Sequence, residues 1–268
     1  MARDSVRCVT AERARFDATG VVHLPSLVPA DEVRAMRAAV WRATQALDRL
    51  PEQDGALRPG PGSEQAMAAV VERAAFDGLA LHLGRGLDAV FGPGAWVPTR
   101  GPWRGVALPN LPGSDARWSV PHRHWHVDEP TTADRPHPYS LGAFVFVDRV
   151  AAGGGATVAM LGSPRRLRAL AVDLAPGRAL TLDESTRGLA RVEPWVDALL
   201  RPGSDPAARH RRFMIDGCVS ADVPLRVVEL IGEPGDVILM DLRCLHAPSA
   251  NVGDRPRLIV KMACVAQP

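Results

Sequence analysis

The chain has 268 residues, of which 46% are hydrophobic, and its 32 basic and 30 acidic residues give a formal net charge of +2. This length suits one large β-barrel or sandwich domain with a sizeable core. The balance of charge, without a long run of either sign, excludes the basic surface of a nucleic-acid binder, and apolar runs such as LGAFVFV are too short to span a bilayer. We therefore expect one soluble domain over residues 1–268.

The first part of the chain, residues 1–95, is expected to form a helical support. The stretch FDATGVVHLPSL predicts a short apolar strand. A helix should follow it, with Pro29 and Asp31 as start signals and apolar residues spaced close to the 3.6-residue period. The Gly- and Pro-rich sequence PEQDGALRPGPGSEQ indicates a connection, after which a second helix is predicted from Ser63 to Leu83.

From residue 96 to residue 268 the sequence changes to short extended runs separated by Gly and Pro. The runs YSLGAFVFVD, GATVAML, LRVVELI, GDVILMD and RLIVKMACV have strand length and are rich in Val, Ile and Leu. This layout is typical of a jelly roll or barrel. Helix-like sequence from about residue 163 to residue 208 predicts a helical insertion. The expected fold class is mainly β with helices, built on a double-stranded β-helix (jelly-roll) core.

The cysteines are too few and too widely spaced to suggest a framework of disulfide bonds. There are four, without CxxC spacing and without an apolar targeting segment before them: Cys8, Cys218, Cys244 and Cys264. Such a set predicts reduced, mostly buried thiols and a cytoplasmic protein.

The stretch PHRHWHVDEP contains metal-capable side chains at every second position: His122, His124, His126 and Asp128. In a β-strand, alternate side chains share one face, so an extended segment would direct all four the same way. Four such groups are more than one ion can use, and the question is which of them hold a metal.

The extended run is expected to cover residues 118–127 and to stop at Glu129 and Pro130, because proline lacks the ladder donor and restricts the residue before it. Asp128 would then lie at the exit of a strand. Its carboxylate could turn back toward an ion held by His126.

Another metal-capable residue, His246, lies in GEPGDVILMDLRCLHAPSANVGDRPRLIV near the C-terminus, where Arg257 opens the last predicted strand. Adjacent antiparallel strands lie about 4.8 Å apart, so a closed barrel could bring His246 beside the first pair with Arg257 one layer deeper. Two His and one carboxylate leave positions open on an ion, which suits non-haem Fe(II) that must bind a co-substrate and O2 together. A structural zinc site would be closed by four protein ligands.

These motifs, in this order, resemble the phytanoyl-CoA dioxygenase family of Fe(II)/2-oxoglutarate-dependent oxygenases. ERARFDATGVVHLPSLVPADEVRAMRAAV is similar to that family's first strand and helix, WHVD to its first iron motif, and GGGATVAMLGSPR to its glycine turn and following strand. GDVILMDLRCLHAPSANVGDRPRLIV resembles its second iron motif with the 2-oxoglutarate arginine. The matches run from about Glu12 to Val260.

The resemblance implies an Fe(II) site whose ligands are His126, Asp128 and His246. It also implies that Arg257 pairs with the distal carboxylate of 2-oxoglutarate, a role that suits a planar guanidinium. Two hydroxyl residues are candidate contacts to the same co-substrate: Thr157 and Ser249. The implied reaction consumes O2 and 2-oxoglutarate, releases succinate and CO2, and usually hydroxylates an unactivated C–H bond.

Residues near the first motif are candidates for substrate binding: Arg117, His122 and His124. The two histidines could instead be satisfied polar residues of a strand. A further set could shape a pocket or belong to the core: Trp103, Arg104 and Trp118.

The composition also bears on the substrate. Nearly every basic residue is Arg, with Lys261 as the only lysine, which indicates a GC-rich bacterial source. We therefore expect a small-molecule substrate, in bacterial natural-product biosynthesis, and a monomer or weak homo-oligomer without nucleic-acid or membrane partners.

Other functions remain open at this point. The same scaffold could carry out desaturation, cyclisation or halogenation, although halogenation needs a vacant iron position that Asp128 fills. His124, His126 and Asp128 also form the His-x-His-x-Asp pattern of dinuclear metallo-hydrolases, but Glu129 stands where that motif normally continues with His. A catalytically silent jelly-roll binding protein is a further alternative.

Overall fold

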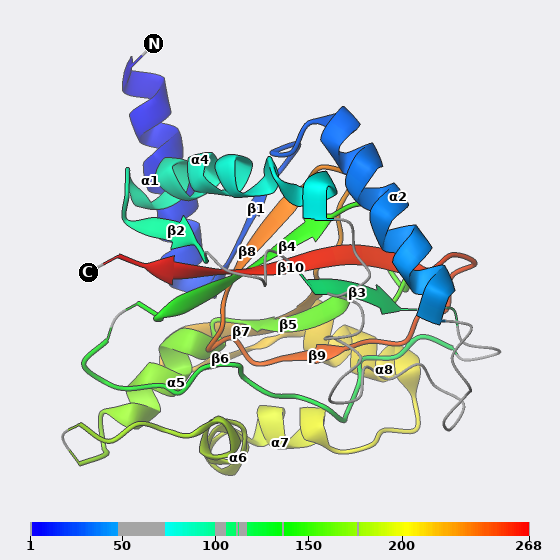
Figure 1. Cartoon of the computed structure of the whole chain (residues 1–268). Helices are drawn as coiled ribbons and strands as arrows, with labels where there is room; N and C mark the ends of the chain where they lie inside the picture. Colours follow the sequence, from blue (N-terminus) through cyan, green and yellow to red (C-terminus); the bar gives the residue numbers. More distant parts are fainter. Residues whose placement is uncertain are drawn as a thin grey trace.

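The computed structural model describes residues 2–47, 73–99, 106–110, 112, 117–135, 137–175 and 177–267. Within these ranges the chain forms two antiparallel sheets that lie against each other at the centre of the molecule, with helices on both outer sides (Figure 1). The predicted class, mainly β with helices around a jelly-roll core, is confirmed.

The larger sheet contains these strands: β1 Val21–Leu24, β2 Trp96–Pro98, β3 Val106–Asn110, β4 Ser140–Phe146, β8 Val237–Asp241 and β10 Arg257–Ala266. The smaller sheet contains these: β5 Thr157–Leu161, β6 Cys218–Ser220, β7 Val223–Glu229 and β9 His246–Pro248. Their orders are β1-β8-β4-β10-β2, with β3 also on β10, and β6-β7-β5-β9. Each of the five apolar runs after residue 130 that the sequence predicts as strands overlaps one of these strands, and FDATGVVHLPSL contains β1.

Strand β10 separates the outer core from the space between the sheets. Successive side chains of a strand point to opposite faces. Leu258 and Val260 lie in the hydrophobic cluster shared with the N-terminal helices, whereas Ile259 lies in the cluster between the two sheets. Arg257 and Lys261 lie two residues before and two residues after Ile259 on this strand, so they face the interior as Ile259 does.

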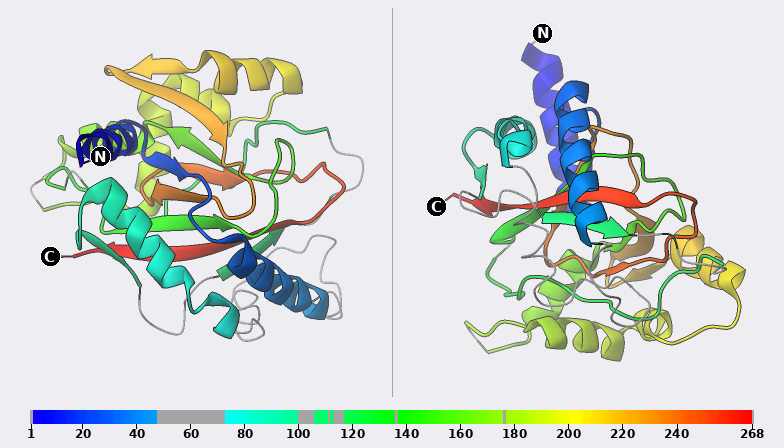
Figure 2. Two further views of the ribbon diagram at one scale, coloured as in Figure 1. Left: turned by 90° about the horizontal axis from the view of Figure 1, so that it is seen from above. Right: turned by 45° about the vertical axis from the view of Figure 1, so that its right-hand side comes forward.

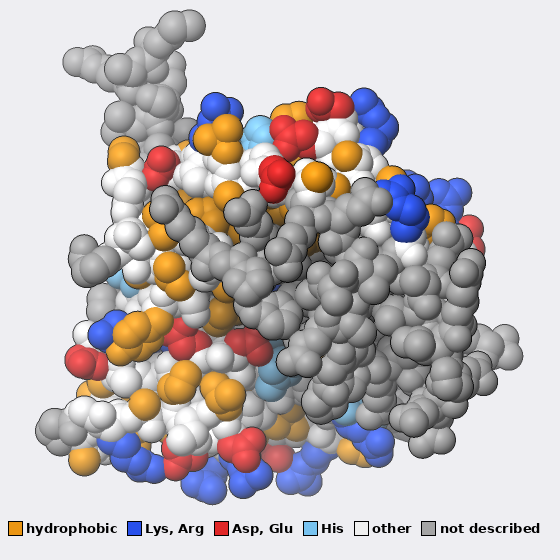
Figure 3. Space-filling model, in the orientation of Figure 1, with side chains coloured by type: hydrophobic (Ala, Val, Ile, Leu, Met, Phe, Trp, Pro, Cys, Tyr) orange, Lys and Arg blue, Asp and Glu red, His pale blue; other side chains and the backbone are white. Residues whose placement is uncertain are grey.

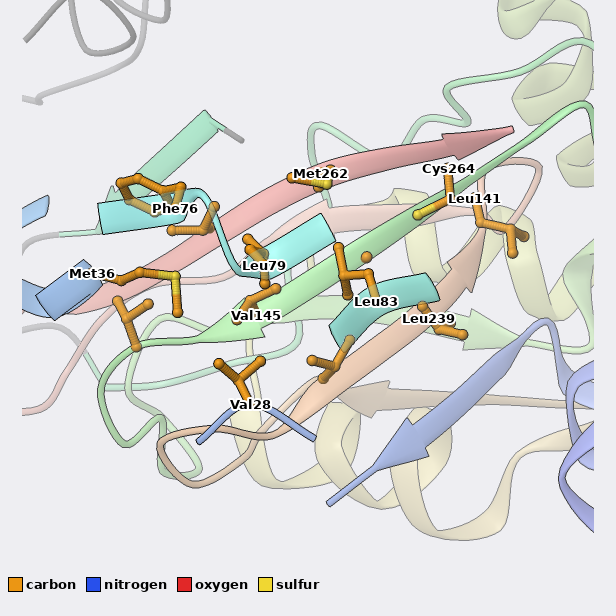
Figure 4. Packing of buried hydrophobic residues seen from close by; sticks show 14 of the residues in the cluster. Val28, Met36, Phe76, Leu79, Leu83, Leu141, Val145, Leu239, Met262 and Cys264 are labelled. Atoms are coloured by element: carbon orange, nitrogen blue, oxygen red, sulfur yellow. The ribbon is translucent and has the colours of Figure 1, made fainter. Parts of the chain in front are cut away.

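The outer face of the larger sheet is covered by α1 Ala2–Thr19, α2 Ala30–Leu47 and α4 Leu79–Phe91 (Figures 1 and 2). Figure 4 shows Met36 and Leu79 from these helices packed over Val145 of β4. Helix α2 is the helix predicted after Pro29, and its first turn carries acidic residues, which stabilise a helix N-terminus.

Predictions for the N-terminal part need two corrections. Helix α1 continues to Thr19, so only β1 within FDATGVVHLPSL is a strand. The helix predicted from Ser63 to Leu83 begins outside the described residues. Its described part is a 3-10 turn, η1 Arg73–Phe76, followed by α4, which extends to Phe91. Apolar residues at helical spacing on α4 are buried, and this packing overrides the low helix propensity of its two glycines.

The helical insertion covers the outer face of the smaller sheet (Figure 1). Its elements are α5 Ser163–Ala171, α6 Leu182–Val192, α7 Pro194–Leu200, α8 Pro206–His210 and the π-helical turn η2 Arg211–Asp216. Leu167, Leu189 and Trp195 form one cluster with Val158 and Met160 of β5. The insertion therefore fixes the sheet that carries β9.

The surface agrees with the balanced charge of the sequence. On the face drawn in Figure 3, acidic, basic and hydrophobic side chains are interspersed. Among the described residues, no helix has the length and apolar character that crossing a membrane requires.

Candidate metal centre

Three side chains with metal-binding atoms meet between the two sheets: His126, Asp128 and His246. One ligand atom from each lies within 4.8 Å of the others. Nε2 of His126 is 3.5 Å from Oδ1 of Asp128, and Nε2 of His246 is 3.6 Å from Oδ2. Bonds of about 2.1 Å from one ion place its ligand atoms roughly 3 to 4 Å apart, so the three residues fit a single metal ion.

Backbone hydrogen bonds bring these residues together from distant parts of the chain. His126 and His246 exchange two, in which each N–H donates to the other's carbonyl at 2.9 Å. The N–H of Asp128 donates to the carbonyl of Leu242 at 2.8 Å. The first motif is thereby attached to the turn between β8 and β9.

That turn is held by a buried ion pair. Arg243 donates from Nε to Oδ1 of Asp241 at 3.0 Å and from Nη2 to Oδ2 at 2.7 Å, and both side chains are 4% exposed. Its Nη1 donates to the carbonyl of Arg135, beyond the first motif. Such a bidentate pair has a fixed geometry, so it stabilises the backbone that leads into His246. A cavity of about 530 Å³ between α1 and α5 is lined in part by this ion pair and by none of the three ligands.

The segment before the first motif is not the strand that the sequence predicts. Residues 118–127 make only an isolated β-bridge, from His126 to His246. His124 has a φ of 63°, in the left-handed region, which interrupts an extended backbone. The predicted strand was wrong, and with it the reason to place His122 and His124 on the same face as the metal ligands.

Hydrogen bonds from side chains account for this irregular path. Arg209, 7% exposed, donates to the carbonyls of Val120 and Pro121 at 3.1 and 3.2 Å. The same guanidinium donates to two carbonyls at the end of α7, both at 2.9 Å. The indole of Trp125 donates to Pro121 at 2.9 Å. Since these carbonyls are satisfied by side chains, the segment needs no neighbouring strand.

Both histidines are oriented by backbone carbonyls behind them. Nδ1 of His126 lies 2.7 Å from the carbonyl of His124, and Nδ1 of His246 lies 2.9 Å from that of Cys244. A carbonyl only accepts, so each Nδ1 carries the proton and each Nε2 keeps its lone pair toward the cluster.

The electrostatics favour the charge states that metal binding requires at His246 and Asp128, whereas at His126 a metal ion must compete with a proton. Burial lowers the pKa of His246 to about 4, so its ring is neutral at neutral pH. Burial opposes ionisation of Asp128, but His126 and Lys261 outweigh it and hold the pKa of the carboxyl well below its usual range. The Asp128 carboxylate in turn raises the pKa of His126. A carboxylate beside imidazole lone pairs is a suitable donor set for a divalent ion.

Lys261 is a site residue that sequence reasoning did not identify. Its Nζ donates to Oδ2 of Asp128 at 2.6 Å. The available signal was its rarity, because it is the only lysine in the chain and lies on the strand that Arg257 opens.

The predicted 2-oxoglutarate residues meet where β5, β9 and β10 adjoin. Arg257 is 7% exposed, and its Nη1 donates to Oγ1 of Thr157 at 3.3 Å. Burial lowers the pKa of Arg257 to about 10, which leaves the guanidinium charged at neutral pH. Ser249 is also buried, but its hydroxyl donates to the carbonyl of Ala156 at 2.7 Å, so this hydrogen is already used by the backbone.

The predicted substrate residues lie on the irregular segment. Arg117 and His124 are exposed, and His122 is half-buried. His124 contributes its carbonyl to the site. Trp118 packs against the hydrophobic cluster of the helical insertion, as a core residue does. Two further candidates lie outside the described residues: Trp103 and Arg104.

The cluster also bears on the metallo-hydrolase alternative, which needs His124 beside His126 and Asp128. His124 is not a member of the cluster, and His246 supplies the third ligand. The arrangement is therefore two histidines and one carboxylate around one position, the set that suits an ion with open coordination positions.

No protein-family model and no curated protein matches the sequence. Solved structures match in fold. The non-heme alpha-ketoglutarate-dependent carbocyclase SnoK from nogalamycin biosynthesis has a TM-score of 0.58 and 17% identity over 98% of this chain and 86% of SnoK. The epimerase SnoN, in complex with Fe3+, alpha ketoglutarate and nogalamycin RO, has a TM-score of 0.54 and 19% identity over 97% of this chain and 84% of SnoN.

A third similar structure is HygX from Streptomyces hygroscopicus, with nickel and 2-oxoglutarate bound. Its TM-score is 0.51, with 15% identity over 96% of this chain and 87% of HygX. At these identities the similarity shows the fold alone. That fold is shared with SnoN and HygX, whose structures hold 2-oxoglutarate.

Proposed function

We propose that the protein is a non-haem Fe(II)- and 2-oxoglutarate-dependent oxygenase that acts on a small molecule, and that it belongs with the phytanoyl-CoA dioxygenase family. One observation carries the proposal. The two-histidine, one-carboxylate cluster lies on the same interior side of the sheets as the buried, charged Arg257. A metal site with open positions and a buried guanidinium suits a co-substrate that carries a carboxylate at each end.

Each residue has a separate task in this proposal. The bound iron, with 2-oxoglutarate and O2, supplies the oxidation of a C–H bond, with succinate and CO2 as co-products. His126, Asp128 and His246 hold the ion. Arg257 binds the distal carboxylate of 2-oxoglutarate with help from Thr157, while Ser249 orders the adjoining backbone.

Hydroxylation is the outcome that we propose, with cyclisation as the second candidate. SnoK is a carbocyclase and SnoN an epimerase, so proteins with this fold give more than one outcome. Halogenation is disfavoured because Asp128 occupies the position that a halide needs. The natural-product context of these similar structures supports a specialised metabolite as substrate. We further propose a cytoplasmic monomer or weak homo-oligomer.

The first test is ligand binding followed by turnover. Purified protein should bind one Fe(II) without oxygen, and addition of 2-oxoglutarate should produce the visible charge-transfer absorption of an iron-bound 2-oxo acid. With air admitted, succinate should form in a 1:1 ratio to the 2-oxoglutarate consumed.

Two variants control this experiment. Asp128→Ala removes a ligand and should abolish both the absorption and succinate formation. Asp183→Ala changes an aspartate whose side chain is 81% exposed, and it should behave as the wild type. A wild type that binds no divalent metal, or a fully active Asp128→Ala variant, would contradict the proposal.

A further inference from the structure

We infer that Lys261 is a positioning residue for the metal centre: its ammonium holds one oxygen of Asp128, so that the carboxylate offers a metal ion only its other oxygen. This inference rests on the proposed function, because it concerns the same site. It adds a residue that neither the sequence motifs nor the fold comparison indicates.

The distances distinguish the two oxygens of Asp128. Oδ2 lies 2.6 Å from Nζ of Lys261, a short charge-assisted hydrogen bond, while Oδ1 lies 3.5 Å from Nε2 of His126. Nε2 of His246 lies 3.6 Å from Oδ2, so each oxygen faces one histidine, but only Oδ2 also holds the short hydrogen bond with the ammonium. That hydrogen bond engages Oδ2 and leaves Oδ1 as the freer donor to a metal ion. Carboxylates bind metals through one or both oxygens, so a fixed partner on one oxygen selects between these modes.

The lysine stem is held in place by the neighbouring strand. In the β10–β4 ladder Lys261 is opposite Phe144, and Nζ lies 5.7 Å from the centroid of that ring. A Cβ added to Gly142 would lie 3.4 Å from Cε of Lys261 and 3.0 Å from Leu242. The stem therefore passes over a strand position that has no side chain, and the packing directs its end to Asp128.

The choice of lysine is itself informative. The chain has 32 basic residues, and position 261 holds its only lysine. Arginine carries a broad, planar fork with five donors, whereas lysine is a compact point charge on a flexible stem. The compact group suits a contact with a single carboxylate oxygen. Lysine therefore occurs at this position although all other basic residues of the chain are arginine.

The consequence concerns the open positions of the metal. Three protein atoms leave half of an octahedral ion open, enough for a bidentate co-substrate and one further ligand. A carboxylate bound through both oxygens would take one of these positions. By keeping Oδ2, Lys261 preserves the position that 2-oxoglutarate or O2 needs.

The first test uses Co(II), whose visible spectrum reports coordination geometry, in place of iron. In Lys261→Met, a neutral side chain of similar length, Oδ2 is released. We expect a changed Co(II) spectrum and about tenfold weaker 2-oxoglutarate binding to the Co(II)-loaded protein, at the lower end of effects for groups behind metal ligands. The matched control is Arg149→Met, which removes a cation whose side chain is 69% exposed.

The outcomes separate this inference from the proposed function. A wild type that binds no Co(II) refutes both. A wild type that binds Co(II), with a Lys261→Met variant that has the same spectrum and the same 2-oxoglutarate affinity, refutes the inference alone.

A second measurement needs no variant and covers the case in which Lys261→Met does not fold. Because the chain has one lysine, protein grown with ¹³C,¹⁵N-lysine gives a single lysine spin system in NMR spectra. Co(II) is paramagnetic, so an ammonium held on Asp128 should show large shifts or broadening, whereas Zn(II) should leave its signal sharp. A lysine signal that Co(II) leaves unchanged would overturn the inference.

Discussion

The two sides of the candidate metal centre are built differently. His126 and Asp128 lie on a segment without regular secondary structure, residues 117–130, which we call the irregular arm. His246 begins β9 and Arg257 begins β10, and we call these two strands the strand arm. Strand ladders fix the strand arm, whereas side chains from other elements fix the irregular arm. Because the two arms are held by different interactions, we expect them to respond to different substitutions.

The largest effect is expected for Arg209→Met, which acts on the irregular arm. The substitution leaves several buried carbonyls, including those of Val120 and Pro121, without their donors. Buried acceptors that lose charged partners are costly, and we expect the free energy of unfolding to fall by about 4 kcal/mol. Urea unfolding measures this loss, and metal affinity should fall in the variant that still folds.

The control for this substitution is a neighbouring arginine. The side chain of Arg211 is 79% exposed, so Arg211→Met should change the unfolding free energy little. Equal stability of the two variants would show that the buried guanidinium does not fix the irregular arm.

On the strand arm, Arg257→Met should act on the co-substrate rather than on the metal. Loss of a bidentate partner should weaken 2-oxoglutarate binding about 100-fold, equivalent to about 2.7 kcal/mol. Calorimetric titration of Ni(II)-loaded protein measures it, with Ni(II) affinity expected to be unchanged. Arg255→Met, at an exposed position nearby, is the matched control. Unchanged 2-oxoglutarate affinity would remove the role assigned to Arg257.

Asp236→Asn tests stability at the beginning of β8, away from both arms. Asp236 accepts from the N–H of Ser26 at 2.8 Å, from the N–H of Glu233 at 2.9 Å and from Nε2 of His23 at 2.9 Å. Burial raises the pKa of this carboxyl, but these hydrogen bonds outweigh it and lower the pKa below the ordinary 3.8. We expect a loss of about 2 kcal/mol at neutral pH, because an amide cannot accept all of these donors.

The sign of the pH dependence follows from the lowered pKa. The ionised carboxylate contributes stability above the unfolded value of about 3.8, and this contribution is lost as the pH falls through the lower folded value. The stability difference between wild type and Asp236→Asn should therefore shrink in acid. Urea unfolding at pH 7 and near pH 3 measures this change, and a constant difference would contradict the assignment. Metal affinity at pH 7 should be unchanged.

The smallest effect is expected for His124→Gly on the irregular arm. His124 has a φ of 63°, which glycine adopts without strain, and its carbonyl rather than its ring orients His126. We expect stability to rise by about 0.5 kcal/mol, because relief of strain slightly exceeds the added entropy of the unfolded chain. His122→Gly, at a residue without a positive φ, should not be stabilising.

The same variant also tests whether the ring of His124 binds the metal. Metal affinity should be unchanged in His124→Gly, since the backbone carbonyl that orients His126 remains. A large loss would instead make the imidazole a ligand and revive the metallo-hydrolase alternative.

The sequence by itself determined the jelly-roll class and the location of its main strands. Runs such as GDVILMD and RLIVKMACV are strand-length and apolar, and they form β8 and β10 because strand formation is visible in local composition. The motif order also indicated which histidines and which aspartate to examine, and the structure brings those three side chains together.

Only the tertiary structure decided the path of the irregular arm and the partner of Asp128. The alternation in PHRHWHVDEP resembles a strand, but the carbonyls at its start, of Val120 and Pro121, are bound by Arg209, which comes from the helical insertion. Lys261 of β10 likewise reaches Asp128 on the irregular arm, 133 residues away in the sequence. Local sequence reports which groups need partners. Which distant groups satisfy them is set by packing, and packing exists only once the chain has folded.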